Sequence, residues 1–216
     1  MRKTLLALTL LIASPALAQE QQQPPPADAP APVPQAVTQA PTNPPMTGPR
    51  ILIATSMGDI TLQLDSVRAP KSVANILRYV KEKHFDNTAF YRVAKGFVIQ
   101  MGSWDANGNG RSIHAGAVPL EANNGLRNLR GAVALGRNDA PDSATAEFYI
   151  NLADNMPLDH KPGDPGNTTG YAVFGQVESG MEVVDAIGNV PTGGKGPMPE
   201  QAPVTPIIVK KVTLLK

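Results

Sequence analysis

The sequence contains no cysteine, and that absence excludes several kinds of structure and chemistry. No disulfide can cross-link the fold, so its stability must come from the packing of side chains. No thiolate is present to act as a catalytic nucleophile. A bacterial lipoprotein anchor, which needs a cysteine, is excluded as well.

The common catalytic motifs are also missing. The serines occur without the G-x-S-x-G pattern of a nucleophile elbow. The three histidines, His84, His114 and His160, lie far apart and belong to no H-E-x-x-H spacing, so we expect solvated side chains rather than metal ligands. The GNG at 108–110 lacks the third glycine of a dinucleotide-binding loop. Hydrolysis, a bound metal and a nucleotide cofactor are therefore all disfavoured.

The chain has neither an excess of one charge nor a long apolar run. Its 19 Lys and Arg residues stand against 18 Asp and Glu residues, a balance that offers no electrostatic surface for nucleic acid. The most apolar run, LLALTLLIA at 5–13, is too short to cross about 30 Å of hydrocarbon, and we expect no membrane span elsewhere. It follows Arg2 and Lys3 and precedes an Ala-x-Ala pattern that ends at Ala18. This arrangement predicts a signal peptide over 1–18, removed on export to the periplasm.

Residues 19–49 are rich in proline, glutamine and alanine and have few large apolar side chains. Such a composition cannot bury enough surface to offset the entropy of ordering. We expect a disordered spacer that can be deleted without loss of folding or activity; a proline-rich docking ligand is the alternative. The remainder, 50–216, is long enough for one domain with a hydrophobic core.

The domain combines many strand-like segments with two helical ones. Strands are expected at 50–56, 58–64, 89–102 with a break at Lys95-Gly96, 132–136, 147–152, 171–177 and 204–215. Helices are expected at 70–85, where Pro70 suits the first turn, and at 180–188. Because the strands are joined by tight turns without a regular alternation with helices, a mainly β fold is favoured. We predict a closed, eight-stranded antiparallel barrel with two helices covering its ends.

The segment AFYRVAKGFVIQMG places a cation and an amide in an otherwise apolar strand pair. By the twofold period of a strand, Phe90 and Arg92 share one face, and Val98 and Gln100 share a face beyond the glycine. A cation, an amide and an apolar surface without a general base suit a reaction in which no bond is made or broken. The alternative is an arginine whose stem packs while its head pairs with a carboxylate such as Glu147.

The same segment is similar to the sequence signature of the cyclophilins, usually written with Phe-His-Arg, Pro-Gly-Phe and Gln-Gly-Gly. The blocks RGAVALGR, DSATAEFYINLADN, LDH and GYAVFGQVESGMEVVDAI extend the resemblance, in order, over nearly all of 50–216. The chain is thereby identified as a member of the cyclophilin family, most similar to its bacterial periplasmic isomerase A group. The resemblance implies a peptidyl-prolyl cis-trans isomerase without metal or cofactor. It also implies a monomer that acts on proline-containing, unfolded or partly folded polypeptides.

The resemblance further implies roles for individual residues. Arg92 matches the catalytic arginine, which donates a hydrogen bond to the prolyl nitrogen as the twisted amide loses its resonance. Phe97 and Val98 correspond to the pocket for the proline ring, and Gly136 and Arg137 to the backbone along which the peptide lies. The positions that match the substrate-binding groove are Phe97, Val98, Gln100, Gly136, Arg137, Glu147, Tyr149, Leu158 and Tyr171.

Several positions depart from the family pattern. Tyr149 stands for a phenylalanine, Pro157 for an aromatic residue and Glu147 for a glutamine. The Glu147 carboxylate either holds the Arg92 guanidinium away from substrate or preorganises it, and the sequence leaves both open. These departures motivate a second hypothesis, a proline-binding or chaperone module with reduced turnover. The loop at 161–169 is also longer than the usual bacterial connection, so one rim of the groove is expected to differ.

Overall fold

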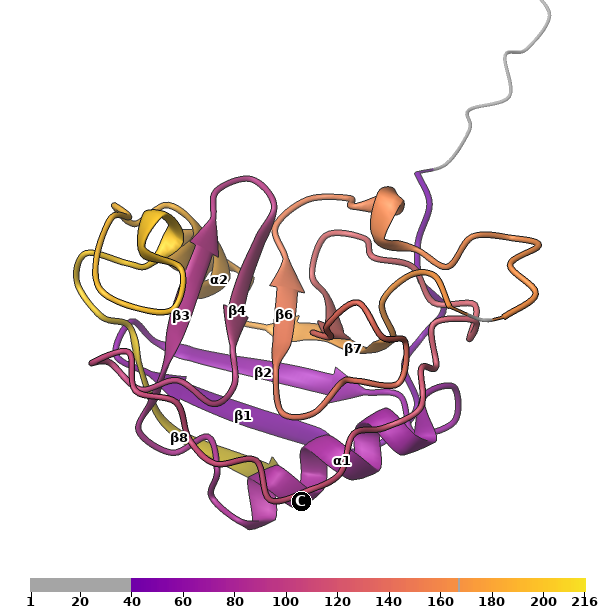
Figure 1. Cartoon of the computed structure of the whole chain (residues 1–216), viewed down its shortest axis with the longest axis horizontal. Coiled ribbons are helices and arrows are strands. Elements are labelled where there is room, and N and C mark those ends of the chain that lie inside the picture. The colour runs from indigo at the N-terminus through magenta and orange to yellow at the C-terminus, as the bar shows by residue number, and fades with distance from the viewer. Residues whose placement is uncertain (1–39, 167) are drawn as a thin grey trace, which may run out of the picture. The chain divides into compact units, whose positions relative to one another are not determined.

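The computed structural model describes residues 40–166 and 168–216. The signal peptide expected at 1–18 and residues 19–39 of the expected spacer lie outside the described residues. In the described chain, strands and helices follow one another as shown in Figure 1. The strands are β1 (Arg50–Thr55), β2 (Asp59–Leu64), β3 (Thr88–Ala94), β4 (Val98–Met101), β5 (Ala132–Leu135), β6 (Phe148–Asn151), β7 (Val173–Ser179) and β8 (Ile208–Leu215). The α-helices are α1 (Pro70–Lys81) and α2 (Met181–Gly188), and the short 3-10 helices are η1 (Met156–Leu158) and η2 (Pro199–Gln201).

The strands form one closed barrel in the order β1-β2-β7-β5-β6-β4-β3-β8. Every neighbouring pair is antiparallel. Closure gives each strand a partner on both sides, so the sheet has no free edge. The predicted fold class, a closed eight-stranded antiparallel barrel with two α-helices, is confirmed.

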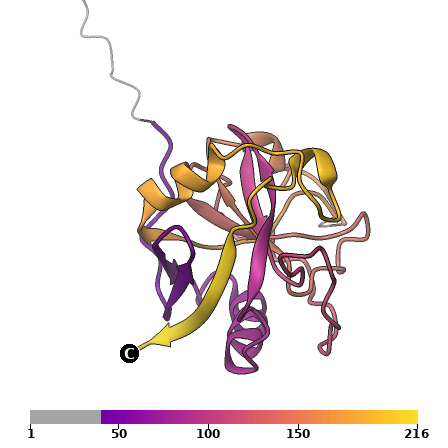
Figure 2. The same ribbon diagram turned by 90° about the vertical axis from the view of Figure 1, so that its left-hand side faces the viewer.

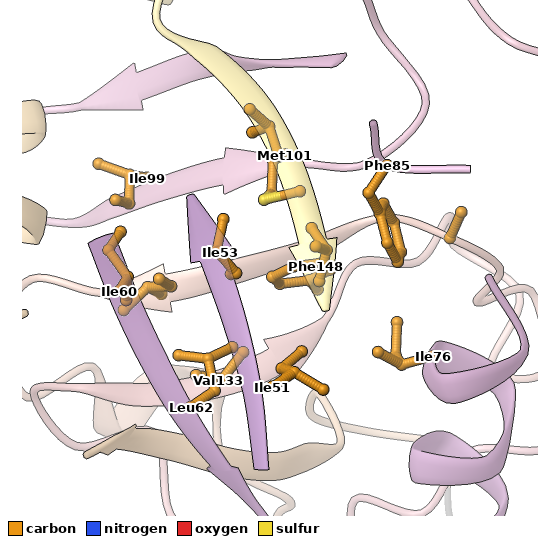
Figure 3. Close-up of a cluster of buried hydrophobic side chains, with 14 of the residues drawn as sticks. Ile51, Ile53, Ile60, Leu62, Ile76, Phe85, Ile99, Met101, Val133 and Phe148 are labelled. Carbon is orange, nitrogen blue, oxygen red and sulfur yellow. The ribbon is translucent and has the colours of Figure 1, made fainter. Parts of the chain in front are cut away.

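The interior of the barrel is filled with apolar side chains from alternating strand positions. Ile51 and Ile53 of β1, Ile60 and Leu62 of β2 and Phe148 of β6 are all fully buried. Figure 3 shows these side chains gathered in one cluster inside the barrel. Burying a side chain of this size contributes about 1.5–3 kcal/mol. Because the interior is packed with side chains, a binding site must lie on the outer surface of the barrel.

The two α-helices cover opposite ends of the barrel (Figure 2). Helix α1 begins with Pro70, whose missing N–H costs nothing in the first turn. It turns Val73, Ile76 and Val80 toward the core, at the spacing of a single helical face. In the described part of the chain, no helix is both long and apolar enough to cross a bilayer.

Helix α1 ends at Lys81, before the predicted end. The chain then turns through Lys83 and Asn87, both of which have positive φ. His84 lies inside this turn and is buried, with its Nε2 atom 3.0 Å from the Oγ atom of Ser103. The prediction that His84 is solvated was therefore wrong. Burial lowers the pKa of its imidazole and favours the neutral form.

The packed unit begins before residue 50, within the segment expected to be a spacer. The Asn43 side chain donates to the Arg127 carbonyl and accepts from the Arg127 N–H, both at 2.8 Å. Met46 packs against an apolar cluster on the outside of the barrel. Residues 43–49, which we call the N-terminal strap, are therefore held by specific bonds. Composition alone did not reveal them, because the attachment depends on Asn43, on Met46 and on backbone carbonyls of the strap: the Pro49 carbonyl accepts from the Leu64 N–H and the Thr47 carbonyl from the Ser66 N–H.

Candidate functional site

A β-bulge in β3 determines which side chains face outward at the centre of the site. Phe90 pairs with Met101, but Arg92 pairs with Gln100, so Tyr91 is the extra residue on β3. Phe90 consequently points into the core while Tyr91 and Arg92 both line an outer groove. The prediction that Phe90 and Arg92 share a face was wrong, because the bulge interrupts the twofold period.

Two neutral amide oxygens hold the guanidinium of Arg92. Its Nη1 atom donates to Oε1 of Gln100 at 2.9 Å, and its Nε atom donates to Oε1 of Gln201 at 2.6 Å. Gln100 is the direct cross-strand neighbour on β4, and Tyr149 follows it on β6. The described residues place no carboxylate within salt-bridge distance of Arg92. The cation is therefore oriented without being neutralised.

An apolar hollow lies beside Arg92 on the outer face of β4 and β6. Phe97 enters it from the turn at Lys95-Gly96, where Gly96 has φ of +70° and the Phe97 N–H donates to the Ala94 carbonyl at 2.9 Å. The hollow is lined by Phe97, Val98, Tyr149, Leu158 and Tyr171. Ala132 and Ala134 of β5 belong to the same outer cluster as these side chains, and their small size leaves room for the rings.

Buried asparagines fix the far side of this hollow. The Tyr149 hydroxyl donates to Oδ1 of Asn128 at 2.9 Å, and the Asn128 Nδ2 group donates to the Leu158 carbonyl at 3.1 Å. Asn155 donates through its side chain to the carbonyl of Phe97 at 3.0 Å. The positions of three hollow-lining residues are thus set by hydrogen bonds as well as by packing. Burial raises the pKa of Tyr149 well above its ordinary value, so its hydroxyl stays protonated.

Gly136 and Arg137 form an extended rim along the groove. The Arg137 side chain donates to the carbonyls of Thr168 and Gly170, and its guanidinium lies 5.0 Å from the centre of the Tyr171 ring. It thereby fastens the long loop expected at 161–169 to the rim. Among the described residues, neither the backbone N–H nor the carbonyl of Arg137 has a hydrogen-bond partner. Both groups are available to an extended peptide.

Glu147 lines the groove but makes no hydrogen bond or ion pair with Arg92 in the described chain. Its Oε1 atom accepts a hydrogen bond from the Ser103 N–H at 2.8 Å, while Oε2 is buried with no well-aligned partner in the described chain. The carboxylate lies directly on Gly102, where any Cβ would collide with it. Burial raises the pKa of the Glu147 carboxyl above its ordinary value, and the bond from Ser103 opposes this. Burial, and then the charge of Glu147, raise the pKa of the neighbouring Tyr91.

All ten residues singled out from the sequence lie around one open groove of about 460 Å³: Arg92, Phe97, Val98, Gln100, Gly136, Arg137, Glu147, Tyr149, Leu158 and Tyr171. Six further residues line the same groove and were not foreseen: Tyr91, Trp104, Asn138, Ser143, Thr145 and Met198. Tyr91 is adjacent to Arg92, but only the bulge turns it outward. Trp104 and Met198 come from loops without periodicity, so no sequence pattern marked them. Pro157 lines a neighbouring hollow instead.

The chemistry of this groove is that of binding and polarisation. Within the described chain, no group of three or more His, Asp or Glu side chains is placed to hold a metal ion. Beside the apolar hollow the groove offers the oriented cation of Arg92 and the cross-strand amide of Gln100, and its rim offers free backbone groups. This combination can hold an apolar ring and donate a hydrogen bond beside it.

Comparisons with known proteins agree with this geometry. Residues 50–214 match the family model described as cyclophilin type peptidyl-prolyl cis-trans isomerase/CLD. The chain is 42% identical over 170 residues to peptidyl-prolyl cis-trans isomerase A of Dickeya dadantii, covering 79% of this chain and 86% of that protein. It is 42% identical over 162 residues to peptidyl-prolyl cis-trans isomerase B of Escherichia coli, covering 74% of this chain and 96% of that protein.

A solved structure shares the fold. The crystal structure of a cyclophilin type peptidyl-prolyl cis-trans isomerase from Cryptosporidium parvum matches with a TM-score of 0.65. The match covers 78% of this chain and 98% of that one, at 24% sequence identity. A likeness at this identity supports the barrel architecture and is silent on individual side chains.

Proposed function

The chain belongs to the cyclophilin-type peptidyl-prolyl cis-trans isomerase family, and from that premise we propose how, and on what, it acts. It is an isomerase of the peptide bond that precedes proline. Our proposal is that Arg92 stabilises the twisted amide in a non-covalent mechanism. Its substrates are unfolded or partly folded proteins exported to the periplasm, where the enzyme assists their folding.

The observation that carries the mechanism is the pair of neutral acceptors on Arg92. Rotation about the X-Pro bond faces about 20 kcal/mol, because the twisted amide loses its resonance. The prolyl nitrogen then regains a lone pair that can accept a hydrogen bond. Gln100 and Gln201 occupy two of the five guanidinium N–H groups. The remaining three N–H groups have no protein acceptor in the described chain, so Arg92 can donate one to the twisted nitrogen.

The apolar hollow and the rim supply the rest of the proposed site. The proline ring enters among Phe97, Tyr149 and Leu158, which hold it while the preceding carbonyl turns. The free N–H and carbonyl of Arg137 pair with the peptide backbone on the other side. A bound peptide is then fixed on both sides of one rotatable bond. Binding of this kind favours the twisted state only if Arg92 donates more strongly to it than to the planar one.

A direct assay of X-Pro isomerisation tests the mechanism against the binding-module alternative. The full chain is added to a proline-containing tetrapeptide, and the rate of cis-trans exchange is followed by NMR without a coupling protease. Faster exchange that depends on Arg92 is expected. Binding of the peptide without acceleration would instead favour a proline-binding or chaperone module with little turnover.

Export to the periplasm rests on the sequence of residues 1–18 and is tested separately. Expression of the full chain in a Gram-negative host should give a shortened product that begins at Gln19 and is released by osmotic shock. The N-terminal sequence of that product identifies the cleavage point. A full-length product confined to the cytoplasm would contradict the proposed location without affecting the assigned enzymatic activity.

A further inference from the structure

The second acceptor on Arg92 comes from a part of the chain that the sequence did not connect with the site. Gln201 lies 109 positions after Arg92, and its Oε1 atom accepts from Nε at 2.6 Å. It is the last residue of η2, which packs against β3. Gln201 is not among the residues that line the groove. It therefore contacts Arg92 without lining the groove itself.

The segment 191–204, which carries Gln201, is held together by backbone hydrogen bonds between its two ends. The N–H groups of Gly193 and Gly194 both donate to the Ala202 carbonyl at 2.9 Å, and the Val204 N–H donates to the Pro191 carbonyl at 2.9 Å. Ala202, the next residue after Gln201, is 1% exposed. Gly194 approaches the Pro203 carbonyl so closely that a Cβ would collide with it. These contacts fix the backbone at Gln201.

We propose that Gln201 is a positioning residue for Arg92, a role that rests on the proposed mechanism. A planar guanidinium held at one nitrogen can still rotate about that hydrogen bond. Held at Nε by Gln201 and at Nη1 by Gln100, its plane is fixed. Both acceptors are neutral amides, so the orientation is gained without the charge neutralisation that a carboxylate would bring. The Nη2 group and one Nη1 hydrogen have no acceptor in the described chain, and Arg92 lines the groove.

The central variant is Gln201→Leu, which removes the acceptor and nearly preserves the size of the side chain. We expect kcat to fall by about tenfold, less than the loss of the guanidinium itself, because the cation remains but its orientation is no longer fixed. KM should change little, since the apolar hollow is untouched. Glu200→Gln is the matched control on the same short helix; Glu200 is exposed and makes no hydrogen bond with another described side chain. It should keep the rate of the parent enzyme.

Two measurements separate positioning from a merely structural role. The Nε–H of Arg92 should exchange slowly with solvent in the parent enzyme and quickly in Gln201→Leu, as followed by 15N NMR. In a double-mutant cycle, Gln201→Leu should cause no further loss once Arg92 is replaced by alanine. A further loss in that background would overturn the proposal, because Gln201 would then act by another route.

A second variant keeps the proposal testable if Gln201→Leu folds poorly. Gln201→Asn keeps the amide but withdraws it by one carbon, and we expect an intermediate kcat and intermediate exchange of the Arg92 Nε–H. If Arg92→Ala lowers the rate while both Gln201 variants turn over normally, the positioning role is wrong and the mechanism stands. If Arg92→Ala itself is fully active, the mechanism and the positioning role both fall.

Discussion

Glu147 accepts a hydrogen bond from the backbone N–H of Ser103 at 2.8 Å, and its carboxylate forms no ion pair with Arg92 in the described chain. The sequence left open whether that carboxylate blocks or preorganises the guanidinium. Neither direct contact exists in the described chain, because Gln100 and Gln201 are the acceptors on Arg92. The structure thus removes the main reason for expecting reduced turnover from the substitution at 147.

The buried carboxyl of Glu147 makes stability depend on pH. Its pKa is raised by burial, so the folded protein holds this proton more tightly than the unfolded chain does. The contribution to the free energy of unfolding is therefore largest below the ordinary pKa of glutamate and is lost as the pH rises through the raised value. Glu147→Gln does not titrate and can keep the bond from Ser103. We expect its Tm to exceed that of the parent at pH 8, and the difference to shrink toward pH 4.

Calorimetry of both proteins across that pH range checks this prediction. The activity of Glu147→Gln at neutral pH should stay close to that of the parent enzyme, since Arg92 keeps both of its amide acceptors. A Tm difference that is constant with pH would mean that the Glu147 carboxyl has an ordinary pKa in the folded protein.

Replacing Arg92 by alanine should lower kcat/KM by a factor on the order of 10², the usual cost of losing one transition-state donor. Stability should change little, because Arg92 is partly exposed and forms no ion pair with the described residues. Isomerisation rates and thermal melting measured on the same preparation check both parts. Lys95→Ala is the matched control: it removes a nearby exposed cation that does not line the groove. An arginine that serves only packing would give the reverse result, a lower Tm with activity that follows the folded fraction.

The barrel was predictable because its strands and helices carry their own periodic patterns, which depend on neighbours in the sequence. The bulge at Tyr91 was not predictable. One extra residue on β3 reverses the face on which the preceding residues of that strand lie, and no glycine marks its position. Gln201 and Met198 were missed for another reason. They belong to a loop with no period, and both the contact of Gln201 with Arg92 and the place of Met198 in the groove depend on the folding of 191–204 as a whole.

Amino-acid composition also failed to predict contacts that depend on single side chains. The strap at 43–49 has the same proline-rich character as the residues before it, yet Asn43 and Met46 attach it to the barrel. For Glu147, the sequence pattern predicted a position near Arg92 but not the hydrogen-bond partner of its carboxylate. That partner is the Ser103 N–H, which donates to the carboxylate, and Gly102 leaves space for it.

Tyr149→Phe should separate the stability of the hollow from its function. The Tyr149 hydroxyl donates to Asn128 at 2.9 Å in a buried network, and its removal leaves Oδ1 of Asn128 with only a 3.4 Å contact from Asn151. We expect a loss of about 1 kcal/mol in the free energy of unfolding. Because the aromatic ring is kept, kcat/KM should not change appreciably. Denaturant unfolding and isomerisation rates are the measurements, and a large fall in rate without loss of stability would mean that the hydroxyl acts on substrate.

The last prediction concerns the boundary between the spacer and the strap. Deleting 19–39 should leave the Tm unchanged, whereas deleting 19–49 should lower it, because only the second deletion removes the bonds of Asn43 and the packing of Met46. The point variant Asn43→Ala isolates the contribution of the two hydrogen bonds between the Asn43 side chain and the Arg127 backbone. It should cost about 1–2 kcal/mol, which corresponds to a fall in Tm of roughly 2–8 °C for a domain of this size.

Thr42→Ala is the matched control for Asn43→Ala, since Thr42 is exposed and its side chain makes no hydrogen bond within the described chain. Differential scanning calorimetry of the parent and these four variants gives the comparison. Because the strap packs on the same outer cluster as Val98 and Tyr149, loss of the whole strap should also loosen the apolar hollow and raise KM for a proline peptide. Equal Tm values for the two deletions would show that the strap contributes nothing to folding in solution, and that the domain begins at residue 50 after all.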